Sequence, residues 1–392
     1  MNLDARIEGL CALAASGDPV VTLTLDVSES GILPKETAIF LRDRVYRTLE
    51  RARNGDPRAA GLASAATRIR SYVGSSLRPG SHGLYLAAGN SIFEAIELNV
   101  PLRNSLQVGS VPGVAPLVEA AQRWPRTLCV RYDDRAVEIR EFDMGSMEVV
   151  ENRVAGTVES NVEHSGVGAR AVRHGLKAGG SGIGGDRRDR YHQRVEGAVE
   201  ILLRRAARSI NERVRGRGAR LLLEGSGPRV NLLRRHLSPA ARASILDAGR
   251  PSREEDSGFG RVTQGLQKAY ADDVERWALE FHARRAEGRG VALGPEGVIL
   301  ALAGGSVARL YVTADDPVPG ARCGNCGSLF AGVQETCSHC GGEARPVSLA
   351  EEALRQAIRH ETFGVTFIPP TGGWLADLGG MAALLGKGGG AS

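Results

Sequence analysis

Hydrophobic and polar residues follow two kinds of pattern along this chain, and together they predict strands and helices in mixed order. The apolar, β-branched run at 20–27 predicts a buried strand that ends in a turn-prone segment. Apolar residues then recur about every 3.6 positions over 35–53, which predicts a helix. Apolar runs at 83–89 and 91–98 predict a hairpin, and a helix is predicted over 112–122.

The middle of the chain shows the same mixture of patterns. Strands are predicted at 127–133, 136–142 and 219–225, and helices at 191–211 and 229–237. This order predicts a partly parallel sheet covered on both faces. The helix at 191–211 is amphipathic, because its apolar residues fall on one stripe and its arginines on the other face. The polar stretch 150–180 is predicted to be irregular.

The last part of the chain again mixes elements, and it closes with an apolar segment at 378–385 and a flexible tail at 386–392. The elements predicted before that segment are helices at 263–286, 297–303 and 349–360 and strands at 307–312 and 364–368. The fold class is therefore α/β in the mixed α+β sense, with mixed sheets and flanking helices. We predict three domains, 1–122, 123–250 and 251–392, with a polar linker at 249–256.

Composition supports a globular protein and locates its positive charge. The hydrophobic fraction is 42% and the charged fraction 24%, and no apolar run reaches the ~18 residues that a membrane span needs. The beginning of the chain lacks the features of a signal peptide, so a cytoplasmic location is expected. The net charge is only +5, but residues 170–220 hold fourteen Lys and Arg against five Asp and Glu. A local excess of this kind is typical of a contact with a polyanion, although a solvated helix face is the competing interpretation.

A glycine-rich stretch begins this basic region. Five glycines fall within Gly179–Gly185, and such a segment resists ordering until something binds it. Three arginines follow at once, and the predicted helix continues from them. We predict that this loop and stem contact RNA phosphates. The predicted RNA-binding residues are Lys177, Gly179, Gly180, Ser181, Gly182, Arg187, Arg188, Arg190 and Arg194.

Two catalytic or cofactor motifs fit this stretch only formally. The spacing of Gly180, Gly182 and Gly185 matches a dinucleotide-binding loop, but the residues before it are polar where that motif needs a strand. The nucleophile elbow needs a second glycine where Ile183 stands. No catalytic residue is assigned, and His82 is expected to be structural.

Four cysteines form the most specific motif in the chain. Cys323, Cys326, Cys337 and Cys340 have the spacing C-x2-C-x10-C-x2-C, which suits four thiolates around a structural Zn²⁺. Disulfides are the competing interpretation, and the expected reducing location disfavours them. The site has no open ligand position, and His339 is expected to be a bystander.

The order of these parts resembles that of the bacterial relatives of the archaeal and eukaryotic class-1 peptide-release factor and Pelota family. The resemblance is carried by the first strand, the glycine loop with its basic stem, the cysteine insertion and the closing segment Gly379–Leu385. It implies an N-terminal decoding-side domain, a central domain, and an L30e-like third domain with an inserted zinc ribbon. It also implies binding to the ribosome, through rRNA and possible tRNA contacts, and to a translational GTPase, by a chain that is monomeric off the ribosome.

Two departures from the family pattern alter the expected activity. Release factors carry Gly-Gly-Gln in the central loop, whereas this chain has Gly179, Gly180 and Ser181. A misplaced catalytic group costs about 100-fold in rate for a shift of about 1 Å, so weak or absent peptidyl-tRNA hydrolysis is expected. The first domain also lacks the stop-codon-reading Asn-Ile-Lys-Ser motif.

The resulting hypothesis is a factor that occupies the A site of idle or stalled ribosomes in hibernation or rescue, more a binding protein than an enzyme. One alternative is a peptidyl-tRNA or tRNA hydrolase that acts in rescue. Another is a general RNA-binding module without preference for the ribosome.

Overall fold

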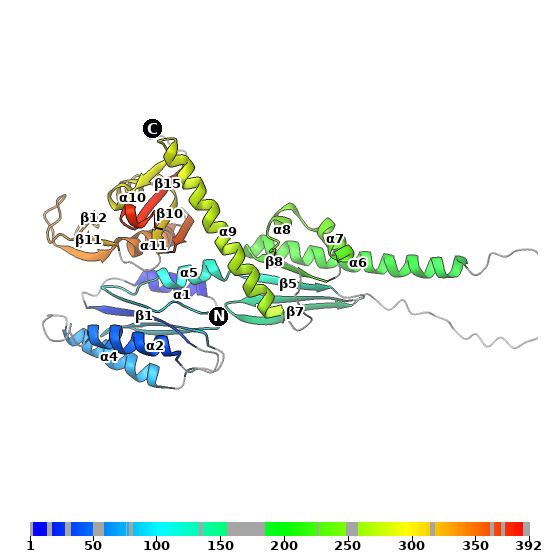
Figure 1. The fold of residues 1–392 in the computed structure, drawn as a ribbon, viewed down its shortest axis with the longest axis horizontal. Helices are drawn as coiled ribbons and strands as arrows, with labels where there is room; N and C mark the ends of the chain where they lie inside the picture. The colour runs from blue at the N-terminus through cyan, green and yellow to red at the C-terminus, as the bar shows by residue number, and fades with distance from the viewer. Residues whose placement is uncertain are drawn as a thin grey trace, which may run out of the picture. The chain divides into compact units, whose positions relative to one another are not determined.

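A computed structural model describes most of the chain. The residues it describes are 3–13, 18–27, 33–49, 59–75, 77, 81–132, 136–154, 185–225, 227–247, 258–313, 318–360, 364–369 and 373–386. One compact unit combines Met1–Trp124 with Leu266–Ser392, and Pro125–Gly265 forms a second unit (Figure 1). The predicted division into three domains is not tested by this arrangement and stays a prediction. The mixed α/β fold class is confirmed by four small sheets flanked by helices.

Residues 3–123, called the first segment below, contain an antiparallel sheet in the order β3-β2-β1-β4. Its elements are α1 (Leu3–Ala12), β1 (Val20–Asp26), α2 (Lys35–Phe40), a π-helical turn (Leu41–Tyr46), α4 (Ala59–Gly74), β2 (Gly83–Ala88), β3 (Phe93–Leu98), β4 (Ser105–Gly109) and α5 (Ala115–Arg123). The strand predicted at 20–27 and the predicted hairpin are confirmed, and β1 is buried from Val20 to Leu25 because both faces of the sheet are covered. The helices α1 and α4 and the strand β4 were not predicted.

Residues 258–386, called the third segment below, contain a mixed sheet in the order β14-β10-β15-β9. Its elements are α9 (Gly258–Ala286), β9 (Val291–Leu293), α10 (Gly294–Ala303), β10 (Val307–Thr313), α11 (Leu349–His360), β14 (Gly364–Ile368), a short 3₁₀ helix (Ala376–Leu378) and β15 (Met381–Leu385). An insertion between β10 and α11 forms its own three-stranded sheet from β11 (Pro319–Cys323), β12 (Leu329–Ala331) and β13 (Ala344–Ser348). The insertion predicted around the cysteines is thus confirmed. Apart from Gly386, the predicted tail lies outside the described residues.

Helix α11 joins the first and third segments, and Figure 1 shows it lying over α1 and α5. Glu351 is buried and accepts hydrogen bonds from the backbone N–H groups of Val114 (2.8 Å) and Ala115 (3.0 Å), where α5 begins. Arg355, one turn further along, donates to the carbonyl oxygens of Leu10 and Cys11 at the end of α1. A carboxylate thus meets the positive end of one helix dipole and a guanidinium meets the negative end of another.

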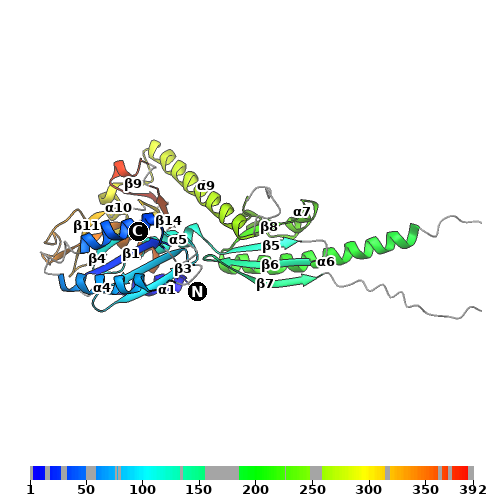
Figure 2. The same ribbon diagram turned by 60° about the horizontal axis from the view of Figure 1, so that its bottom comes forward.

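The central unit is a four-stranded sheet in the order β7-β6-β5-β8, in which β5 and β8 are parallel as the strand–helix order predicted (Figure 2). Its strands are β5 (Thr127–Tyr132), β6 (Ala136–Asp143), β7 (Ser146–Val154) and β8 (Arg220–Glu224). The prediction that the chain is irregular from residue 150 was wrong, because β7 continues to Val154. Met144 and Gly145 both have positive φ, which allows the two-residue turn between β6 and β7.

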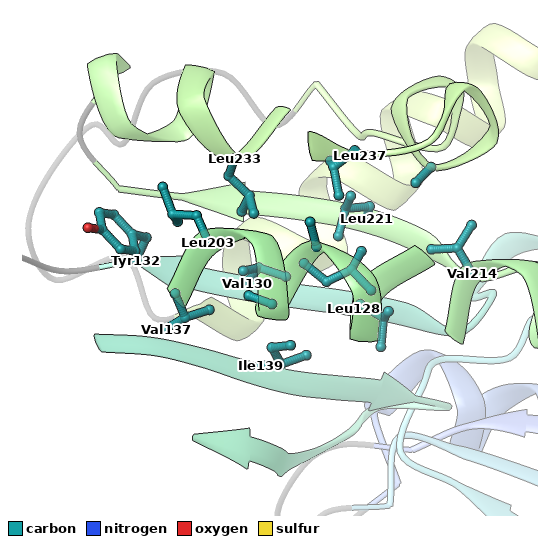
Figure 3. Close-up of a cluster of buried hydrophobic side chains, with 14 of the residues drawn as sticks. Leu128, Val130, Tyr132, Val137, Ile139, Leu203, Val214, Leu221, Leu233 and Leu237 are labelled. Atoms are coloured by element: carbon teal, nitrogen blue, oxygen red, sulfur yellow. The ribbon is translucent and has the colours of Figure 1, made fainter. Parts of the chain in front are cut away.

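Helix α6 (Gly185–Arg217) packs along the apolar face of this sheet, with α7 (Gly227–His236) and α8 (Pro239–Ala243) beside it. The predicted apolar stripe is confirmed at Leu202, Leu203, Ala206 and Ile210, which lie in one buried cluster with residues of β5, β6 and β8 (Figure 3). The 33 residues of α6 span about 50 Å at 1.5 Å per residue. The helix is therefore longer than its strands, and its first turns run past the ends of the sheet (Figure 1).

Candidate functional site

The four cysteines of the inserted sheet lie together, as their spacing predicted. Their four Sγ atoms all lie within 4.8 Å of one another. Two of these separations, Cys323 to Cys340 and Cys326 to Cys337, are 3.5 Å. A tetrahedral Zn²⁺ with Zn–S bonds of ~2.3 Å needs sulfur atoms about 3.8 Å apart. The arrangement therefore fits a four-coordinate metal ion with little movement, and the cluster is a candidate metal site.

The backbone around the cluster explains why each Cys-x-x-Cys pair is followed by glycine. Gly327 and Gly341 have φ values of 74° and 71°, which side chains other than glycine adopt only with strain. Each closes its turn by donating an N–H to the carbonyl oxygen of the first cysteine of the pair, at 3.1 Å and 3.0 Å. A Cβ at Gly342 would lie only 3.0 Å from the Cβ of Asn325, so a larger residue there would require its neighbour to shift.

The surroundings of the thiols prepare two of them to ionise. The amide and hydroxyl of Ser328 hold the pKa of Cys326 at about 6. The N–H groups of Cys326 and Asn325 lower the pKa of Cys323, each 3.4 Å from its sulfur. Burial instead raises the pKa of Cys337 to about 11 in the metal-free cluster. Because metals bind thiolates, this last thiol must lose a proton on metal binding.

His339 lies beside the cluster but outside the group of four sulfurs. Its Nδ1 is 3.2 Å from the Ser328 hydroxyl, and its ring packs edge-on against Phe330. These contacts agree with the predicted bystander role. The remaining cysteines, Cys11 and Cys129, are buried as free thiols away from the cluster.

The second candidate site is the basic helix of the central unit. Arg204, Arg205 and Arg208 are exposed on the face of α6 opposite its buried stripe. Within the described residues, Arg204 has an ion pair with Glu200 one turn earlier. Exposed pairs of this kind contribute little stability, so the guanidinium groups remain able to bind another anion.

The glycine loop and its stem are only partly described. Lys177, Gly179, Gly180, Ser181 and Gly182 lie outside the described residues. The structure places Arg187, Arg188, Arg190 and Arg194 within α6 and does not describe their side chains. The RNA-binding prediction for all nine residues therefore stays a prediction. A related finding is that α6 begins at Gly185, six residues before the predicted start.

Several polar residues that the sequence did not single out gather where α11 meets the first segment. The stripe Glu351, Arg355 and Arg359 is spaced by four residues, so its side chains share one helix face. In the sequence, charges at this spacing indicate only that the residues share one face of a helix. The backbone groups to which they hydrogen-bond come from distant parts of the sequence. The partners of this stripe could be found only in the fold.

No family model matches the chain, and no curated protein matches it in sequence. Solved structures do resemble it. An archaeal translation termination factor, aRF1, is 13% identical with a TM-score of 0.24, and the similarity covers 98% of this chain and 96% of that one. A model of ribosome-bound archaeal Pelota with ABCE1 is 12% identical with a TM-score of 0.38, covering 98% and 94%.

A third structure is that of Dom34 from S. cerevisiae, described as a translation termination-like factor that interacts with Hbs1. It is 10% identical with a TM-score of 0.37, and the similarity covers 77% of this chain and 79% of Dom34. These neighbours come from the release-factor and Pelota family that the sequence resembles. Their TM-scores are low, so the function has to be argued from the residues of this chain.

None of the helices in the described residues is long and apolar enough to cross a membrane.

Proposed function

We propose that this protein is a ribosome-binding factor of the release-factor and Pelota type. It occupies the A site of idle or stalled ribosomes, in hibernation or rescue, and it works in the cytoplasm. The observation that carries the proposal is helix α6, which follows the glycine-rich segment directly and exposes Arg204, Arg205 and Arg208 opposite a buried stripe.

The chemistry of α6 suits folded RNA. Guanidinium groups bind phosphates in a bidentate manner, and contacts of this kind supply most of the sequence-independent affinity for nucleic acids. Leu203 and Ile210 hold the helix on its sheet, so the arginines are presented from a fixed support. In the proposal, residues 179–185 lead α6 toward the peptidyl-transferase centre, and the first segment lies near the decoding centre.

The third segment is proposed to bind a translational partner protein. The ribosome-bound Pelota model includes ABCE1, and Dom34 is described as interacting with Hbs1. By analogy, an elongation-type GTPase or an ATPase is the proposed partner of this chain. A structural zinc ion held by Cys323, Cys326, Cys337 and Cys340 would stabilise the small inserted sheet, which has few apolar residues of its own.

The proposed factor does not hydrolyse peptidyl-tRNA. Ser181 stands where the related release factors carry glutamine, and a serine hydroxyl lies on a side chain two bonds shorter. The hydrolase alternative would need Ser181 or a backbone-held water at the same loop.

Ribosome co-sedimentation tests the proposal. The triple variant Arg204→Gln/Arg205→Gln/Arg208→Gln removes three exposed charges and leaves the buried stripe intact. We expect its affinity for vacant ribosomes to fall at least about tenfold. The slope of log affinity against log salt concentration should also become less steep, by the amount that about two to three lost phosphate contacts produce. The matched control, Arg276→Gln/Arg285→Gln/Arg289→Gln, removes two exposed arginines of α9 and one exposed arginine from the turn that follows it. Equal affinity of the two variants would contradict the role of α6, and equal binding to bulk structured RNA would favour the general RNA-binding alternative.

A further inference from the structure

A basic hollow lies between the metal cluster, the start of α11 and the first segment. It has a volume of about 590 Å³. Four arginines line it, and they come from three elements: Arg322 from β11, Arg345 from β13, and Arg355 and Arg359 from α11. Among the described residues that line it, the one carboxylate is that of Glu352, which pairs with Arg322 at 2.5 Å.

Two of these arginines face each other in an arrangement that costs stability. Arg322 and Arg345 are direct partners in the antiparallel pairing of β11 with β13, so their side chains leave the sheet on the same face. Like charges directly opposite each other on a sheet repel. The ion pair of Arg322 with Glu352 offsets part of this repulsion, whereas the pairing of Arg345 with Glu343, at 3.5 Å and largely exposed, offsets little of it. An anion between the two guanidinium groups would turn the repulsion into a binding site.

Arg355 gives an independent sign of a missing partner. Its side chain is only 3% exposed, and its Nη atoms donate to carbonyl oxygens of Leu10, Cys11 and Pro112. Its Nε is buried without a hydrogen-bond partner among the described residues. A buried donor left unsatisfied is costly. Arg359 also donates a hydrogen bond to the carbonyl oxygen of Cys11 (2.7 Å), so a second guanidinium group is held beside that of Arg355.

The charge balance of the hollow favours an anion even with metal in the neighbouring cluster. In the described part of the lining, four guanidinium groups stand against the carboxylate of Glu352. Cys323 and Cys326 also line the hollow, and zinc held by four thiolates carries two negative charges. The sum stays positive, and a planar guanidinium recognises a tetrahedral oxyanion through two parallel N–H donors.

We propose that this hollow is a binding site for a phosphate group, held between Arg322 and Arg345 and backed by Arg355 and Arg359. The site is separate from the basic helix of the central unit. It belongs to the unit formed by the first and third segments, and it is tested on the isolated protein, so it does not depend on ribosome binding.

Isothermal titration of the zinc-loaded full chain with inorganic phosphate, at constant ionic strength against chloride, tests the proposal. We expect saturable binding at one site, and an affinity at least about tenfold lower in Arg322→Gln/Arg345→Gln, since each lost bidentate contact is worth a factor of that order. Arg285→Gln/Arg289→Gln, which removes one exposed arginine at the end of α9 and one in the turn after it, should bind as the wild type does.

A second variant keeps the test informative if the double variant fails to fold. Arg345→Gln alone relieves the repulsion across β11 and β13. It should therefore melt at the same temperature as the wild type or higher in phosphate-free buffer, and phosphate should raise its melting temperature less than that of the wild type.

A short single-stranded RNA without terminal phosphates separates the two sources of the ligand. If the RNA displaces phosphate and its binding is lost in the double variant, the site binds phosphodiesters. If phosphate binds and the RNA does not, the site binds a free phosphate group. Absence of saturable phosphate binding beyond the chloride control, or equal affinity in the double variant and in Arg285→Gln/Arg289→Gln, would overturn the proposal.

Discussion

At the scale of single residues, Cys326 and Cys337 of the four-cysteine cluster differ in how readily each thiol gives up its proton. Ser328 favours the thiolate of Cys326, whereas burial favours the neutral form of Cys337. A metal ion replaces the last thiol proton with a positive charge, so metal binding and proton release are coupled. Metal binding at this candidate site should therefore depend strongly on pH.

We predict that one Zn²⁺ binds per chain and that its affinity rises at least about tenfold per pH unit between about pH 6 and about pH 8. The reason is that Cys337, with its pKa of about 11, is protonated in the metal-free state throughout this range and releases one proton on binding. Competition with a chromophoric chelator at several pH values measures this.

The identity of the ligands is checked by two variants. Cys337→Ser should lose stoichiometric zinc and lower the melting temperature, while His339→Ala, next to the cluster, should keep its zinc. A metal content that depends on His339, or a pH-independent affinity, would contradict the assignment.

The clustering of the four cysteines was predictable because the spacing within each Cys-x-x-Cys pair sets its local geometry. The residues of the basic hollow were not. Arg322 and Arg345 are far apart in sequence, and only the register of β11 with β13 places them opposite each other. The register of β11 with β13 depends on the turn and the four-cysteine cluster between the two strands, so it cannot be predicted from a periodic pattern in the sequence.

At the scale of secondary-structure elements, local patterns identified the strongly amphipathic segments and missed elements whose burial is set by the tertiary structure. The stripe of α6 was predicted because four apolar residues repeat at helical spacing and become buried together. Strand β7 was missed because Val149 and Val154 are exposed, so its apolar residues do not alternate toward a core. The available signal was the glycine turn after Asp143, which favours a hairpin.

Contacts made by helix α11 should affect the stability of the whole unit formed by the first and third segments. Glu351→Gln replaces one of two acceptor oxygens with a donor that faces the N–H groups of Val114 and Ala115. We predict that it lowers the free energy of unfolding by about 1–3 kcal/mol at neutral pH. Chemical denaturation with excess zinc measures this, and Glu296→Gln, an exposed first-turn glutamate of α10, is the matched control.

The pH dependence of this difference has a defined sign. Burial raises the pKa of Glu351 above its unfolded value, so the folded state holds the proton more tightly. Its contribution to stability is then fully present below the unfolded pKa and is lost as the pH rises through the folded pKa. The wild type should gain stability relative to Glu351→Gln as the pH falls from neutral toward the unfolded pKa of about 4.5. A difference that shrinks over this range would contradict the account.

At the scale of the whole molecule, the chain combines a positively charged helix with a four-cysteine insertion in a different unit. The order of these parts was visible in the sequence, because each depends on a local motif. The packing of Met1–Trp124 with Leu266–Ser392 was not, since it rests on buried contacts between residues more than 230 positions apart, such as Glu351 with Val114.

The proposed binding role predicts that peptide is not released. In a single-turnover assay on stalled ribosomes carrying labelled peptidyl-tRNA, this protein should release peptide no faster than the buffer control. The physical reason is that Ser181 cannot place a water where the longer glutamine side chain does, and such a displacement costs about 100-fold or more in rate. A rapid release that Gly180→Ala abolishes would support the hydrolase alternative instead.

Cryo-electron microscopy of this protein bound to vacant ribosomes tests the central claim most directly. The account predicts density in the A site, with Arg204, Arg205 and Arg208 of α6 against rRNA or tRNA phosphates and residues 179–185 ordered near the peptidyl-transferase centre. Density at another site on the ribosome, or α6 turned away from RNA within the A site, would contradict it.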